Sequence, residues 1–80
     1  MKTKILIKNK FGVPVQVKIT FGNEIFEATC YQKYPNLGKW YLHRYDPTFA
    51  LPFMRAFFPC GGKFKSLSHV KKWIRDRKYL

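Results

Sequence analysis

The segment SLSHVKKWIRDRK, residues 66–78, has the periodicity of an amphipathic helix. Its large apolar side chains fall at i, i+3, i+6 and i+7, which is a single helical face; they are Leu67, Val70, Trp73 and Ile74. Ser66 or Ser68 can cap the helix by accepting a hydrogen bond from a backbone N–H that has no helical partner. The other face is basic and carries His69, Lys71, Lys72, Arg75, Arg77 and Lys78. This segment predicts one C-terminal helix with an apolar side to bury.

The chain before this helix has the alternation of β-strands. Apolar and polar residues alternate over 2–8, 13–20, 24–31 and 39–45, and turn-forming residues separate these segments. A further short strand is expected at about 53–58, with a turn at Pro59–Gly62 after it. We therefore predict one α+β domain over residues 1–80. Its fold would be an antiparallel sheet of four to five strands with the C-terminal amphipathic helix packed on it.

The same alternation assigns side chains to the two faces of the sheet. Segment 2–8 would carry Thr3, Ile5 and Ile7 on one side and Lys2, Lys4, Leu6 and Lys8 on the other. In segment 39–45 one face would carry Trp40, Leu42 and Arg44, and the other Lys39, Tyr41, His43 and Tyr45.

Charge is the strongest compositional signal. Sixteen Lys and Arg against four Asp and Glu give a formal net charge of +12, in a chain that is 46% hydrophobic and therefore able to fold. Such a charge favours an acidic partner, with nucleic acid the leading class and an acidic protein surface or an anionic membrane as alternatives. Solubility alone is a weaker explanation, because a net charge of about 2–8 suffices for a small domain.

The sequence has no strong signal for export, for membrane insertion or for metal binding. The apolar run near the start, Ile5–Ile7, is too short for a signal peptide, and no window approaches the roughly 18 apolar residues of a membrane helix. We expect a cytoplasmic protein that does not bind membranes. Cys30 and Cys60 lack metal-ligand spacing, so neither a metal site nor a cofactor is expected.

Catalytic signals are also weak, and we expect no enzyme. Glu24 and Glu27 should point to opposite faces of their strand, so they form no carboxylate pair. One alternative stays open. His43, Arg44 and Tyr45 stand in a basic, aromatic context typical of small toxin-type ribonucleases, which position a phosphate and move protons.

Binding is better supported. Seven cations and one carboxylate lie between Lys63 and Leu80, and this nearly single-sign charge suits phosphate contacts. Aromatic and basic side chains also interleave on the strand that begins near Trp40. We predict a non-enzymatic nucleic-acid-binding protein, with DNA favoured over RNA. Its expected contact residues are Lys39, Tyr41, His43, Arg44, Arg55, Lys63, Lys65, Lys71, Lys72 and Arg75.

A family resemblance supports this prediction. Gly38-Lys39-Trp40, then a strand, then Phe64-Lys65-Ser66-Leu67 before a helix with Val70, Lys72 and Trp73, resembles the arm-type DNA-binding module of phage and transposon integrases. The resemblance covers about residues 38–78. It implies a three-stranded antiparallel sheet whose face enters the major groove. Lys39, Tyr41, His43 and Arg55 would then face DNA, and Lys63 and Lys65 would contact phosphates. The chain departs from the family in its apolar segment 49–58 and in the hairpin, residues 2–31, that precedes the module.

The apolar segment 49–58 suggests a second class of function. Exposed apolar residues there would form a patch for self-association or for a protein partner. The residues expected to do so are Phe49, Leu51, Phe53 and Met54. The alternative to nucleic-acid binding is thus a phage or mobile-element protein that inhibits a host complex by protein contact, as anti-CRISPR proteins do.

Overall fold

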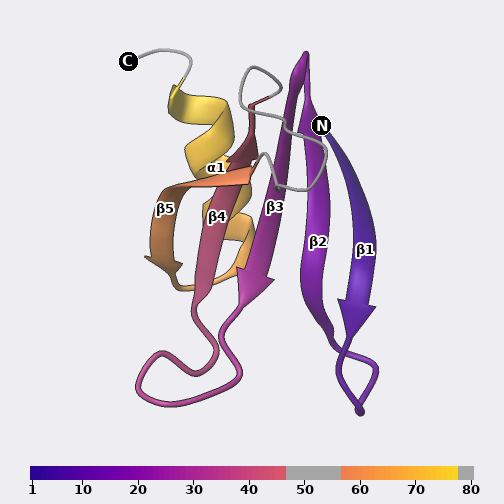
Figure 1. Ribbon diagram of the computed structural model, residues 1–80, viewed down its shortest axis with the longest axis vertical. Helices are drawn as coiled ribbons and strands as arrows, with labels where there is room; N and C mark the ends of the chain where they lie inside the picture. The colour runs from indigo at the N-terminus through magenta and orange to yellow at the C-terminus, as the bar shows by residue number, and fades with distance from the viewer. Residues whose placement is uncertain (47–56, 78–80) are drawn as a thin grey trace.

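Five strands and one helix follow one another along the chain in the computed structural model, which describes residues 1–46 and 57–77. The elements are β1 (Lys2–Lys8), β2 (Pro14–Phe21), β3 (Glu24–Cys30), β4 (Trp40–Tyr45), β5 (Phe57–Phe64) and α1 (Leu67–Asp76). The strands form one sheet in sequence order, each antiparallel to the next (Figure 1). This α+β arrangement of five strands and a C-terminal helix confirms the predicted fold class.

The helix begins as its sequence predicts. The Ser66 side chain accepts a hydrogen bond from the backbone N–H of His69, and Ser66 has the extended backbone conformation of an N-cap. Of the two serines considered, Ser66 is therefore the cap. Val70 and Ile74 are completely buried, and Leu67 and Trp73 pack beside them. The predicted apolar face of the helix is confirmed.

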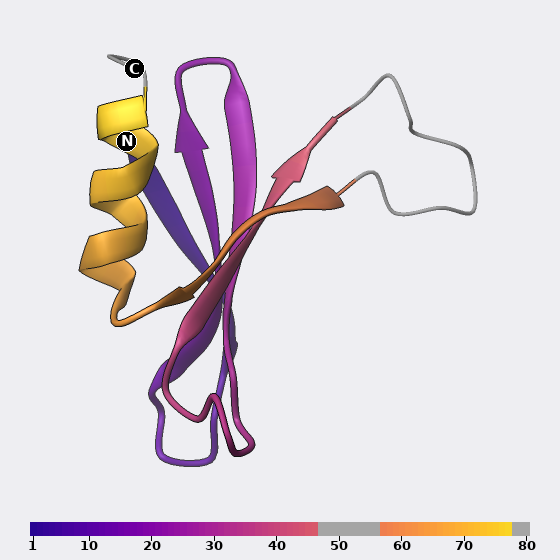
Figure 2. The ribbon, with the colours of Figure 1, turned by 90° about the vertical axis from the view of Figure 1, so that its left-hand side faces the viewer.

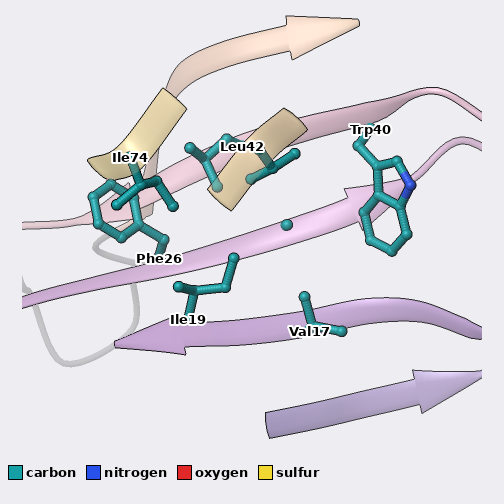
Figure 3. Close-up of a cluster of buried hydrophobic side chains, with 8 residues drawn as sticks. Val17, Ile19, Phe26, Trp40, Leu42 and Ile74 are labelled. Atoms are coloured by element: carbon teal, nitrogen blue, oxygen red, sulfur yellow. The ribbon is translucent and has the colours of Figure 1, made fainter. Parts of the chain in front are cut away.

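The core lies between α1 and one face of the sheet. Alternate residues of the three central strands supply it, and the strand residues are Val17, Ile19, Phe26, Ala28, Trp40 and Leu42 (Figure 3). Their spacing of two is that of a strand with one buried face. The helix contacts β4 and β5 and leaves β1 uncovered, so that all seven residues of β1 are exposed. We call the two sides of the sheet the helix face and the open face (Figure 2).

Arg77 fastens the end of the helix to the sheet. Its guanidinium forms an ion pair with Glu24 at the start of β3. It also lies 5.0 Å from the centroid of the Phe26 ring and 5.8 Å from that of Trp73, distances at which a cation is attracted to an aromatic face. Arg44 approaches the same carboxylate, with 3.8 Å between its Nη2 and Glu24 Oε1. One acidic side chain thus links β3, β4 and the helix terminus.

The predicted alternation in β1 is wrong at one position. Ile5 lies opposite Val17, but Ile7 lies opposite Gln16, with an irregular register between the two pairs. Val17 and Gln16 are neighbours and point to opposite faces. The bulge therefore turns Ile7 away from the side that Thr3 and Ile5 share.

The last strand also differs from the prediction. The structure places Pro59–Gly62 inside β5 and not in a turn, while residues 53–56 of the expected strand lie outside the described residues. β5 is an edge strand, where a proline without an N–H is tolerated. Two register irregularities against β4 accommodate the glycines. A side chain at Gly61 would come within 2.9 Å of the Phe64 ring, so glycine is needed there for packing.

Leu42 tests the position of the core, since its side chain is completely buried below the helix. Replacing it by alanine should lower the free energy of unfolding by about 2–5 kcal/mol, through lost burial and the cavity that remains. Leu37→Ala is the matched control, because Leu37 is 47% exposed and should change stability by about 0.5 kcal/mol or less. Urea titrations followed by tryptophan fluorescence measure both. Equal effects of the two substitutions would contradict the assigned core.

Candidate nucleic-acid interface

The open face is defined by residues that face each other across neighbouring strands. Cross-strand partners in an antiparallel sheet share a face, so the register sorts them into three rows. The middle row crosses all five strands and consists of Lys4, Lys18, Glu27, His43 and Pro59. A second row holds Ile7, Gln16, Thr29 and Tyr41, and a third holds Lys2, Thr20 and Ile25, with Tyr45 and Phe57 paired at its far end.

Lysines occupy the β1–β2 side of the open face. Lys4 lies directly opposite Lys18, and Lys2 stands opposite Thr20 one row away. Lys2 and Lys4 are exposed, and Lys18 is half-buried. Like charges that face each other across a strand pair are destabilising unless something of opposite charge lies near. Glu27 lies opposite Lys18 on its other side and offsets one of the three lysines. The two charges that remain make this end of the face suited to an anion.

Aromatic rings occupy the β4 side. Tyr31, which follows directly after β3, lies 4.5 Å from Tyr41 between ring centroids, and Tyr41 lies 5.3 Å from His43. These three half-buried rings line a hollow of about 560 Å³, the aromatic hollow. Its other lining residues are Leu42, Pro59, Cys60, Gly61 and Gly62.

A second depression adjoins it at the centre of the sheet. This central hollow has a volume of about 240 Å³ and shares Tyr41 and His43 with the aromatic hollow. Glu27 also lines it, directly opposite His43 in the register. The Gln16 amide donates a hydrogen bond of 3.0 Å to Glu27 Oε1 and lies 3.3 Å from the Thr29 hydroxyl. The open face thus brings a carboxylate, an imidazole and an amide to one place.

The predicted contact residues divide between the two sides of the sheet. Tyr41 and His43 lie on the open face. Lys71, Lys72 and Arg75 belong to α1 on the other side, where Lys72 and Arg75 are exposed and Lys71 is half-buried (Figure 2). Arg44 pairs with Phe26 and Phe58 in the register, and so lies on the helix face near Glu24. A single flat surface cannot include all of these residues.

The remaining predicted contact residues lie at the margins of the sheet. Lys39 is exposed directly before β4, Lys63 is exposed in β5, and Lys65 is exposed between β5 and the helix. Arg55 lies outside the described residues, as do Phe49, Leu51, Phe53 and Met54 of the expected partner-binding segment. Oligomerisation through segment 49–58 and inhibition of a host complex therefore stay predictions.

Sequence reasoning assigned no contact role to Lys18, Gln16 or Glu27. Gln16 and Lys18 alternate with the apolar Val17 and Ile19. Glu27 lies between the apolar Phe26 and Ala28, so the pattern places all three polar residues on the outward side of their strands. The sequence does not show that Lys18 faces Lys4, or that Glu27 faces His43. Those juxtapositions depend on strand order and register, which the structure supplies.

Comparisons with known proteins assign no family. No protein-family model matches the chain, and neither the curated proteins nor the solved structures yield a match. Among residues 1–46 and 57–77, no helix is long and apolar enough to cross a membrane. Within the same residues, no three His, Cys, Asp or Glu side chains are grouped as a metal site would require.

Both cysteines are free thiols, and β4 lies between their strands. Burial raises the pKa of the Cys30 thiol, and burial likewise raises the pKa of Cys60, although the Arg44 guanidinium opposes the second shift. A raised pKa leaves less of the reactive thiolate at a given pH. We therefore expect both thiols to react slowly in the folded protein.

Alkylation tests this expectation. At pH 8, iodoacetamide should modify Cys30 and Cys60 severalfold more slowly in the folded chain than in the same chain unfolded in urea. Mass spectrometry of quenched samples would give the two rates. A folded-state rate equal to or above the unfolded rate at either cysteine would contradict the pKa direction given for that thiol.

Proposed function

We propose that this protein binds nucleic acid without catalysing a reaction, and that the open face of the sheet is its interface. The observation that carries the proposal is the composition of that face. Lysines lie at one end and half-buried rings at the other, and no helix or strand of the described chain packs over it. Basic and aromatic side chains on one accessible surface suit a ligand with both phosphates and bases.

The charge of the whole chain supports a polyanionic partner. A net charge of +12 in 80 residues repels itself in the folded state, and neutralisation by phosphates would relieve that repulsion. Each lysine that meets a phosphate also releases counterions, so affinity falls steeply with salt. The exposed helix cations Lys72 and Arg75 would act as a second, separate basic surface.

The integrase-like reading of residues 38–78 points to the same face. That resemblance implies that the sheet, and not the helix, meets DNA, and Tyr41 and His43 belong to the open face. The resemblance is one of architecture, and no family model or solved structure matches the chain.

Two matched double variants distinguish the faces. Lys4→Gln with Lys18→Gln removes two charges from the open face, and Lys72→Gln with Arg75→Gln removes two from the helix. The first pair should weaken binding to a labelled 20-mer DNA about tenfold. It should also make the log–log salt slope shallower by about 0.7–0.9 for each lysine that contacts a phosphate. Fluorescence anisotropy over 50–300 mM salt measures both.

The helix variant is the control for loss of charge alone and should have the smaller effect on affinity and slope. A larger effect of the helix variant would move the interface to α1. Absence of salt-dependent binding by the unmodified protein to single-stranded DNA, duplex DNA and RNA alike would refute nucleic-acid binding itself.

A second candidate function, cleavage of RNA, is favoured by one observation. His43 lies directly opposite Glu27, both line the central hollow, and Lys18 lies in the same row. A carboxylate can accept the proton of the ribose 2′-hydroxyl as its oxygen attacks phosphorus, while an imidazolium gives a proton to the departing 5′-oxygen. Lysines would stabilise the negative charge that develops on the phosphoryl oxygens. The pairing differs from the one expected from sequence, since Arg44 lies on the helix face.

His43→Ala tests this second function. If the protein cleaves RNA, the substitution should reduce cleavage about 100-fold or more, because general acid–base catalysis contributes on that order. Gel analysis of a labelled RNA, with the matched 2′-deoxy strand as a substrate that cannot cyclise, gives the readout. His69→Ala on the helix is the matched control. No cleavage by the unmodified protein, or equal cleavage by both variants, rules the activity out.

A further inference from the structure

The aromatic hollow has the form of a site for an unpaired base. Tyr31, Tyr41 and His43 supply adjacent, partly exposed rings along one side. Gly61 and Gly62 line the other side and have no side chains to fill it. A Cβ added at Gly62 would meet Tyr41 Cβ at 3.7 Å, an ordinary contact, and the Gly62 backbone is not in the left-handed region. The fold therefore tolerates a side chain at Gly62. Because glycine has no side chain, the hollow stays open at this position.

A flat ring that enters this hollow would lie against the tyrosines. Bases stack on aromatic side chains with little dependence on sequence, because every base has a π face. In a duplex those faces are already stacked on neighbouring base pairs, and only unpaired bases present them to a protein. Filling the hollow thus requires a single strand.

The lysines lie at a distance suited to the same strand. Neighbouring strands are about 4.8 Å apart, so Lys18 on β2 stands about 10 Å from the β4 rings, and Lys4 on β1 about 14 Å away. The middle row leads from these lysines to His43 through Glu27, whose carboxylate accepts a hydrogen bond from Gln16. A flexible strand can place a base in the hollow while its neighbouring phosphates meet Lys18 and Lys4.

We propose that the open face selects single-stranded DNA over duplex DNA, with a base inserted in the aromatic hollow and phosphates held by Lys4 and Lys18; this inference rests on the proposed function. The charge of the face requires a polyanion, and the hollow requires unpaired bases. Single-stranded DNA supplies both, with phosphates for the lysines and unpaired bases for the hollow. Neither contact needs a ribose 2′-hydroxyl, which is the group that distinguishes RNA from DNA.

Gly62→Leu tests the hollow directly, because leucine would occupy the space beside Tyr41. Anisotropy titrations would use a labelled dT15 strand, the matched rU15 strand and a 15-base-pair duplex at one salt concentration. The unmodified protein should bind dT15 at least tenfold more tightly than the duplex. Gly62→Leu should lose on the order of tenfold in affinity for dT15, while its duplex affinity and its salt slope stay unchanged.

Two further variants separate stacking from other effects. Tyr41→Ala should weaken dT15 binding as Gly62→Leu does, whereas Tyr41→Phe keeps the ring and should bind almost normally. Ser68→Leu adds the same apolar bulk on an exposed turn of the helix and should change nothing. Circular dichroism of each variant confirms that it is folded before its affinity is interpreted.

The outcomes distinguish this inference from the function on which it rests. Equal affinity for dT15 and duplex, or an unchanged dT15 affinity in folded Gly62→Leu, overturns the base-binding hollow but leaves salt-dependent nucleic-acid binding in place. Tighter binding of rU15 than of dT15 overturns the assignment to DNA. Loss of binding to all three probes in the unmodified protein refutes the proposed function and this inference together.

Discussion

The packing of one ten-residue helix against a five-stranded sheet is the constraint on which the rest of this structure depends. Val70 and Ile74 pack in one cluster with Phe26 and Leu42, and the helix contacts β4 and β5 and leaves β1 exposed. The helix runs roughly along the strands (Figure 1) and is about 10 Å wide, whereas five strands at about 4.8 Å span about 19 Å across the sheet. The helix therefore covers one face in part, and none of the described helices or strands packs on the other face.

The few carboxylates acquire distinct roles from this packing. Glu24 sits at the point where β3, β4 and the end of α1 meet, and two arginines converge on it. Arg77 therefore has a structural role, and its guanidinium also lies over the rings of Phe26 and Trp73. Glu27 lies on the opposite face and accepts a hydrogen bond from Gln16. The two carboxylates therefore differ in role, since Glu24 holds the helix against the sheet and Glu27 belongs to the open face.

Most of the fold could be predicted because its signals are local. Alternation over residues 13–20 and 24–31 gave the buried positions Val17, Ile19, Phe26 and Ala28, and the apolar spacing after Ser66 gave the helix. The failures were at irregularities. A bulge between Ile5 and Ile7 changes the face of Ile7, and an edge position lets β5 contain Pro59 and two glycines. Both depend on the neighbouring strand, which a linear pattern does not encode.

The sequence by itself determined the fold class, the inward side of the central strands and the strong positive charge, since these follow from residue type and spacing along the chain. Only the tertiary structure decided which charges and rings lie together. The strand register places Lys4 opposite Lys18 and Glu27 opposite His43. Because the helix packs on the other face of the sheet, Tyr41 is separated from Lys72 and Arg75. Cross-strand neighbours are far apart in sequence, and a shift of one residue would exchange the faces of the sheet.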